Sequence, residues 1–168
     1  MKYLIKYIIV AAWFMCAFSS PVIAQNVSYM HKLLTPEGCT VNYRVVKNES
    51  DYFIIVSVRS EKLSFLNNPT MKIRTFNDDV ITLNGINVRE NSESLGLVTG
   101  NLVLPITEIT STAQFSITEE ELQMLKDGIE KIRLSMIPKN HERVFKKDKI
   151  GRKLYQFYLD IMEEDEDF

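Results

Sequence analysis

The sequence is poor in the residue types that carry most enzyme chemistry. It contains two histidines, two cysteines and one tryptophan in 168 residues. It has no G-x-S-x-G nucleophile motif, no phosphate-binding glycine loop and no C-x-x-C pair. His141-Glu142 matches the start of an H-E-x-x-H zinc motif, but Phe145 stands where the second histidine is needed. The sequence therefore predicts no catalytic residue, no metal site and no cofactor.

The first 24 residues have the pattern of a cleavable signal peptide. Lys2 and Lys6 precede an uncharged apolar run, and Val22 and Ala24 occupy the −3 and −1 positions of a cleavage site. The run is shorter than the ~20 residues of a membrane-spanning helix, although a retained N-terminal anchor is the alternative. We expect export to the periplasm, cell surface or medium, and a mature chain that begins near Gln25 without a transmembrane segment.

Cleavage would change the composition of the chain. It removes two lysines, so that the net charge moves from −2 to −4, which gives no general attraction to nucleic acid. It also removes Trp13 and Cys16. Residues 25–168 are the length of one domain, with an acidic tail at 163–168. Cys39 has no cysteine partner, so we expect it to be buried; an intermolecular disulfide and a reactive thiol are the alternatives.

The middle of the chain reads as a series of short strands. Residues 40–134 are rich in β-branched and aromatic side chains, and turn residues separate the runs. Asn84-Gly85 predicts a tight hairpin that would place Leu83 opposite Ile86 on one apolar face. A second hairpin is expected around Gly100-Asn101, where apolar residues do not alternate and both faces are expected to be covered. The expected strands are 41–47, 52–59, 71–76, 80–83, 86–89, 95–99, 102–106, 113–117 and 129–137.

Two helices are expected late in the chain. The first covers 118–127, beginning at Thr118 and ending at Asp127, because Thr118 and Glu121 form a capping box and Gly128 can terminate the helix. The second covers 148–162, from Asp148 to Met162, and has an apolar stripe at helical spacing. Together the elements predict a mainly β fold with two helices (α+β), either an antiparallel β-sandwich or a curved sheet, with the C-terminal amphipathic helix docked on it.

A resemblance covers roughly the last third of the chain. The segments Ala113-Gln114-Phe115-Ser116-Ile117-Thr118-Glu119-Glu120-Glu121-Leu122, Gly128-Ile129-Glu130-Lys131-Ile132-Arg133 and Asp148-Lys149-Ile150-Gly151-Arg152-Lys153-Leu154-Tyr155 resemble small exported proteins of unknown function from Gram-negative gut bacteria. That group has no established activity, so the resemblance implies export and a fold but no mechanism.

Few residues remain as candidates for chemistry. His31, Cys39 and His141 could assemble a nucleophilic site, although we expect His31 near a mobile N-terminus and His141 in a polar loop over 138–143. Asn77, Asp78 and Asp79 are expected to form a turn rather than a cation site. Three tyrosines could bind a carbohydrate, but aromatic residues in strands more often belong to the core; they are Tyr29, Tyr43 and Tyr52.

Basic residues gather just before and within the second expected helix. They could meet an anionic surface, an acidic glycan or the acidic tail of another copy, whereas the simpler interpretation is a solvated face. This candidate binding patch, called the basic patch below, consists of Arg143, Lys146, Lys147, Lys149, Arg152 and Lys153.

Three functions remain open at this level. The first is a non-enzymatic binding module for an unknown envelope protein, glycan or anionic surface. The second is a small hydrolase-type enzyme with a site assembled around His141. The third is a structural subunit of an envelope homo-oligomer. The first is preferred because the sequence offers no motif for the second.

Overall fold

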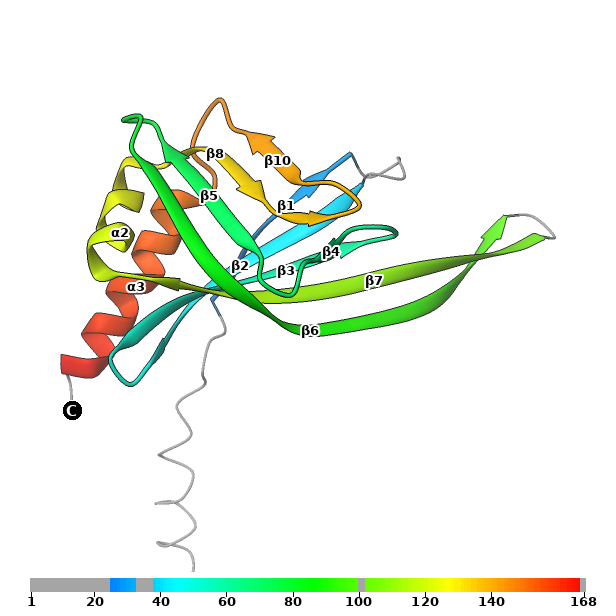
Figure 1. The fold of residues 1–168 in the computed structure, drawn as a ribbon, viewed down its shortest axis with the longest axis horizontal. Coiled ribbons are helices and arrows are strands. Elements are labelled where there is room, and N and C mark those ends of the chain that lie inside the picture. The colour runs from blue at the N-terminus through cyan, green and yellow to red at the C-terminus, as the bar shows by residue number, and fades with distance from the viewer. Residues whose placement is uncertain (1–24, 33–37, 100–101, 167–168) are drawn as a thin grey trace, which may run out of the picture.

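The computed structural model describes residues 25–32, 38–99 and 102–166 and shows a curled, mainly antiparallel sheet (Figure 1). The order of its eight strands is β1-β2-β3-β7-β6-β5-β8-β10, and β4 and β9 form a separate pair. The strands are β1 Val27–His31, β2 Cys39–Asn48, β3 Asp51–Ser60, β4 Ser64–Phe65, β5 Thr70–Thr75, β6 Val80–Thr99, β7 Leu102–Ile117, β8 Ile129–Leu134, β9 Met136–Ile137 and β10 His141–Val144. The helical elements are α2 Glu119–Met124, the 3-10 turn η1 Leu125–Asp127 and α3 Gly151–Glu166.

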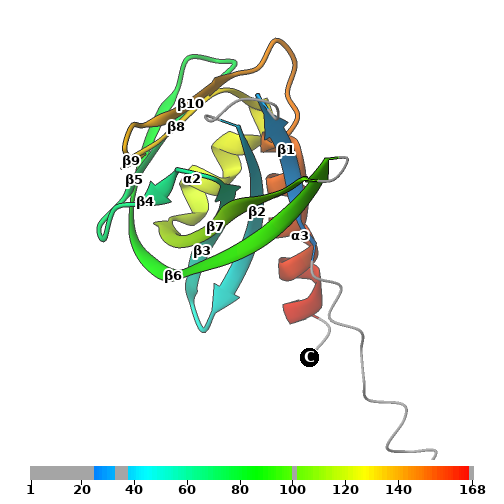
Figure 2. The same cartoon turned by 90° about the vertical axis from the view of Figure 1, so that its right-hand side faces the viewer.

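The expected fold class is confirmed, and the architecture is the curved sheet rather than the sandwich. The sheet curls into a half-barrel, and the helical segments lie at one end of it (Figure 2). Alternate residues of the central strands face the inside of the curl, as in β3, where Ile54, Val56 and Val58 are fully buried. Leu154 of helix α3 closes this core together with Ile150, the residue just before the helix.

Both helices start at side-chain caps. The Thr118 hydroxyl accepts a hydrogen bond from the Glu121 amide, and the Glu121 carboxylate accepts one from the Thr118 amide, which confirms the predicted capping box. Helix α3 begins at Gly151 instead of the expected Asp148. The reason is that the Asp148 carboxylate accepts hydrogen bonds from the first amides of the helix, at 2.9 Å for both Gly151 and Arg152, and so lies outside it.

The expected hairpin at Asn84-Gly85 is wrong, because these residues lie within one continuous strand, β6. Gly85 is required there by packing: a β-carbon at this position would lie 2.6 Å from both the Gln114 carbonyl oxygen and the Phe115 ring. The strand therefore does not fold back, and Leu83 is buried while Ile86 is 54% exposed. The glycine lets two strands approach, which a turn motif read from the sequence alone cannot reveal.

The strand boundaries differ from expectation at four other places. The separate strands expected at 102–106 and 113–117 are one strand, β7. The single strand expected at 129–137 is divided into β8 and β9. The loop expected at 138–143 contains the start of β10, and the N-terminal segment contains β1. The turn expected at residues 77–79 is confirmed, with Asp78 at a φ of 66°.

Candidate functional site

Two edge strands of the sheet, β1 and β10, face each other and close the curl through side chains. The Tyr29 hydroxyl lies 2.8 Å from His141 Nε2, and Arg143 Nη1 lies 3.0 Å from His31 Nδ1. The rings of His31 and His141 meet edge to face, with centroids 5.1 Å apart. These contacts join residues 112 positions apart in the sequence. They form what we call the seam, which contains Tyr29, His31, Cys39, Tyr43, His141 and Arg143.

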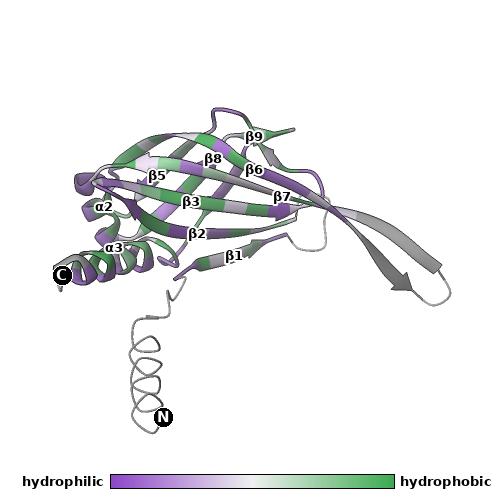
Figure 3. Ribbon diagram, turned by 90° about the horizontal axis from the view of Figure 1, so that it is seen from below, coloured by the Kyte–Doolittle hydropathy of each residue, from purple (hydrophilic) through white to green (hydrophobic). Residues whose placement is uncertain are grey.

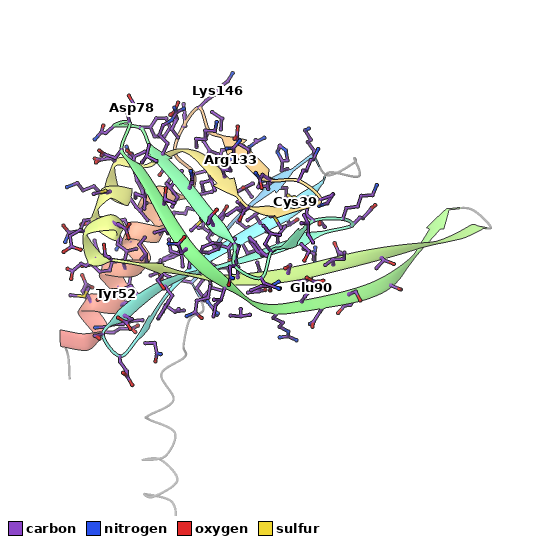
Figure 4. All side chains as sticks on the ribbon, in the orientation of Figure 1. Cys39, Tyr52, Asp78, Glu90, Arg133 and Lys146 are labelled. Carbon is purple, nitrogen blue, oxygen red and sulfur yellow. The ribbon has the colours of Figure 1, made fainter. Side chains whose placement is uncertain are left out.

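The seam brings together the three residues that the sequence offered for nucleophilic chemistry. Cys39 Sγ lies 3.6 Å from His141 Nδ1, and His31 lies against the same imidazole. His141 is buried in β10 and His31 lies in β1, so the expected polar loop and mobile N-terminus are both wrong for these residues. Figure 4 labels Cys39, which is a free, buried cysteine, as expected.

The protonation states in the seam oppose thiolate chemistry. Burial raises the pKa of the Cys39 thiol to about 11. Burial, together with electrostatic repulsion from the neighbouring His31 and Arg143, lowers the pKa of His141 to about 4. Burial also raises the pKa values of Tyr29 and Tyr43 well above the usual range. At neutral pH the cysteine and His141 are therefore both uncharged, whereas an activated cysteine is a thiolate beside an imidazolium.

The tyrosines that could have formed a carbohydrate platform are part of the core. Tyr43 is 1% exposed, and Tyr29 and Tyr52 are each 8% exposed. Tyr29 packs edge to face on Phe145, at a centroid distance of 5.3 Å. Tyr52 packs against Tyr158 of α3 at a centroid distance of 5.4 Å, so none of the three rings offers an exposed stacking surface.

The residues of the basic patch separate into two groups. Arg143 is half-buried in the seam, over the ring of Phe145. The other five are exposed on the loop before α3 and on its first turn, and Figure 4 labels Lys146 at the outer end of this loop. Although burial alone would raise the pKa of Asp148, hydrogen bonds from four backbone amides lower it. This carboxylate offsets the cations at the N-terminal end of α3. The exposed residues are Lys146, Lys147, Lys149, Arg152 and Lys153.

The outer face of the sheet carries a second set of cations, which the sequence analysis missed. Strand register places Lys72 beside Arg133 and Arg74 beside Lys131, around a shallow hollow that Glu142 also lines. Glu142 bridges two of the cations, at 2.8 Å from Lys131 and 3.0 Å from Arg133. Alternation of charged with apolar residues in β5 and β8 was visible in the sequence, but their adjacency depends on the pairing of two distant strands.

Strands β6 and β7 continue past the rest of the sheet as a two-stranded arm. Strand β6 pairs with β5 only as far as Asn84, and β7 pairs with β3 only from Ile109 onward. Residues 93–99 and 102–108 therefore pair, among the described strands, with each other alone. We call these two segments the arm; Figures 1 and 3 show it projecting from the body of the molecule.

The arm has an unusual composition for a projecting ribbon. Residues 95–106 contain no charged residue and are mostly leucine, valine and isoleucine. The strand register pairs Leu95 with Ile106 and Leu97 with Leu104. At the base of the arm the register puts Glu93 directly opposite Glu108, which is unfavourable for two like charges. The Gly100-Asn101 turn itself lies outside the described residues, but the pairing of its flanking strands confirms the predicted hairpin.

The described residues contain no group of three or more histidine, cysteine or carboxylate residues arranged to hold a metal ion. None of the helices that the structure describes is both long and apolar enough to cross a membrane. Residues 1–24, for which a signal peptide is expected, lie outside the described part of the chain.

Neither protein-family models, nor curated proteins, nor solved structures gave a match to this chain.

Proposed function

We propose that this protein is an exported, non-enzymatic interaction module in which the curled sheet is a scaffold and the arm contacts the partner. The observation that carries this proposal is the strand pairing of the arm, whose residues 95–106 are uncharged and pair only with each other. An apolar ribbon held away from the body favours association, because it gains most from being covered.

The organisation of the seam supports a scaffold role. Several of its polar side chains contact one another inside the curl, as in the contact of Tyr29 with His141. Two surface hollows among the described residues lie elsewhere, one on the outer face of β5 and β8 and one beside the β3–β7 ends, and neither is lined by Cys39 or His141. A hydrolase site around His141 is therefore the less favoured function, since it lacks an activated nucleophile beside a hollow that could take a substrate.

The proposal is tested by cross-linking in cells that export the protein. A photoreactive amino acid is placed at Leu104 in the arm. The matched control carries it at Lys72 in β5, on the outer face of the body. We expect a covalent adduct at Leu104 and little at Lys72. Adducts at Lys72 alone, or none at either position, would contradict the proposal. The mass of the exported chain is measured in the same sample, and we expect it to begin near Gln25.

A shortened variant separates interaction from folding. Because Ser94 pairs with Thr107, residues 95–106 can be replaced by Asn-Gly to give a short hairpin turn. We expect this variant to fold with an unchanged far-ultraviolet circular dichroism spectrum and to lose the adducts made by the arm. If the shortened protein formed the same adducts through other positions, the arm would not be the binding element.

A second candidate function is binding of an anionic glycan or lipid headgroup by the basic patch. It is favoured by the exposure of five cations within residues 146–153. Replacement of Lys146, Lys147 and Lys149 by alanine should then weaken binding to vesicles that contain anionic lipid. Unchanged binding would exclude this function for the patch.

A further inference from the structure

We propose that the partner of the arm is a second copy of this chain, with β6 of the two copies paired antiparallel across a two-fold axis at Asn91. This inference rests on the proposed function of the arm and names its partner. Three features of the described residues carry it: an open strand edge, a self-complementary charge pattern, and an exposed apolar residue at the root of the arm.

The open edge belongs to β6 rather than to β7. The amides of Gly85 and Asn87 donate to the carbonyls of Pro69 and Asn67, at 2.9 and 3.0 Å, and thereby occupy the edge close to the body. From residue 88 outward, no described strand pairs with this edge. The free edge of β7 contains Pro105, which has no N–H to donate. Strand addition is therefore favoured on β6.

The sequence of β6 just beyond the body is self-complementary. Residues 89–93 read Arg-Glu-Asn-Ser-Glu, and all five are exposed. In an antiparallel pair centred on Asn91, Arg89 of each copy lies opposite Glu93 of the other copy, so two opposite-charge pairs form by symmetry. Each pair also supplies a cation to Glu93, which lies opposite Glu108 within its own chain. Glu108 itself is held by Arg59, at 3.2 Å.

The side chain at the proposed axis is already oriented by the neighbouring arginine. In the orientation that satisfies both ends of its amide, Asn91 accepts hydrogen bonds from Arg89 at 2.9 and 3.1 Å. This contact holds the guanidinium beside the axis, on the face where Glu93 also lies by strand alternation. The cation is therefore partly pre-positioned for a carboxylate of the second copy.

The same symmetry covers an apolar residue at the root of the arm. Ile86 is 54% exposed and Val88 is 47% exposed, although both lie in the longest strand of the sheet. Pairing at Asn91 places Ser94 opposite Val88 of the second copy. The pairing stops there, because Asn67 and Pro69 already occupy the edge at Asn87 and Gly85. Val88 at the root of each arm is thereby brought beside the start of the arm of the other copy.

A lipid bilayer fits these features less well than a second copy. An open strand edge is not tolerated in hydrocarbon, because its unpaired backbone groups cannot be satisfied there. The base of the arm also carries Glu90, Glu93 and Glu108, which anionic headgroups repel. A second β6 edge satisfies the backbone and offers an arginine to the acidic base.

Charge exchange tests the register of the proposed dimer. Arg89→Glu and Glu93→Arg are made singly and together, and self-association is measured by sedimentation equilibrium. We expect the intact protein to dimerise, each single variant to weaken the dimer by about tenfold or more, and the double variant to return to within about threefold of the intact protein. Failure of the double variant to recover, or a monomeric intact protein at about 100 μM, would overturn the proposal.

A cysteine at the axis gives an independent test. Residues directly opposite in adjacent strands have Cβ atoms about 4.5–5.5 Å apart, so Asn91→Cys should form a disulfide dimer on mild oxidation. Ser94→Cys is the matched control, because its two copies would lie about 20 Å apart in this register. Equal cross-linking of both variants would contradict the axis at Asn91.

Two outcomes identify a different partner. If the arm cross-links to a protein of another mass while the purified chain remains monomeric, the interaction function stands and the second-copy proposal fails. If the protein co-sediments with phosphatidylcholine vesicles and the shortened variant does not, lipid is the partner, and the dimer proposal is again overturned.

Discussion

The seam and the arm are two regions in which strands lack a hydrogen-bonded neighbour on one side, and they differ in whether that side is covered. At the seam, edge strands β1 and β10 turn toward each other, and buried side chains such as Tyr29 and His141 join them. In the arm, β6 and β7 leave the sheet and pair only with each other. The seam buries most of its side chains within the chain, and the other region leaves a strand edge open. The comparison places the buried side-chain contacts in the curl and the open strand edge at the arm.

The largest expected effect on stability comes from a core substitution in the part of β7 that still pairs with β3. Phe115 is fully buried, and its ring packs against Gly85. We expect Phe115→Ala to lower the free energy of unfolding by about 3–5 kcal/mol, as measured by urea denaturation. Replacement of residues 95–106 by Asn-Gly should change it by less than about 1 kcal/mol. A comparable loss from both variants would show that the arm is part of the cooperative core.

The next largest effect is the pH dependence of stability that His141 of the seam produces. His141 has a pKa of about 4 in the folded protein and about 6.5 when unfolded, so the unfolded chain binds the proton first as pH falls. The stabilisation is fully present above pH 6.5 and is lost as pH falls toward 4, by on the order of 3 kcal/mol.

The contribution of this histidine is measured as a difference between two proteins. Free energies of unfolding are determined between pH 7.5 and 4 for the intact chain and for His141→Gln, which removes the titrating group. We expect the loss of stability between pH 6.5 and 4 to be much smaller in the variant. Parallel curves would mean that His141 is not buried in its neutral form.

Thiol reactivity compares the two regions directly. The pKa of Cys39 is raised to about 11, which leaves roughly 100-fold less thiolate at pH 8 than an ordinary cysteine has. We expect Cys39 to react with iodoacetamide at least about 100-fold more slowly than a cysteine introduced at exposed Ser94. Similar rates would show an accessible, activated thiol and would revive the hydrolase function.

The smallest expected effect on stability comes from comparing two glycines of β6, one in the body and one in the arm. A methyl group at Gly85 would meet the Gln114 carbonyl and the Phe115 ring at 2.6 Å. Gly85→Ala should therefore destabilise the protein by about 1–3 kcal/mol. Gly96→Ala, in the arm, should change the free energy of unfolding by less than about 0.5 kcal/mol. The stability of both variants is measured by thermal unfolding. Equal losses of stability would contradict the distinction between body and arm.

Much of the local structure could be predicted, whereas the candidate site could be predicted only in part. Thr118 and Glu121 are three residues apart, so their capping box is visible in the sequence and is confirmed. The burial of Cys39 follows from its chemistry and is also confirmed. The arm was predicted as a hairpin of apolar residues with both faces covered, and not as a ribbon that pairs only with itself, because the absence of a third strand depends on where β3 and β5 end.

The sequence by itself determined the elements whose signals lie within a few residues: the helix caps, the alternating strands and the turn at Asp78. Only the tertiary structure decided that Gly85 accommodates Phe115 instead of forming a turn, and that His141 meets Cys39 and Tyr29. The physical reason is that helix caps and turns are satisfied by near neighbours, whereas strand pairing and curl closure join residues far apart in the chain.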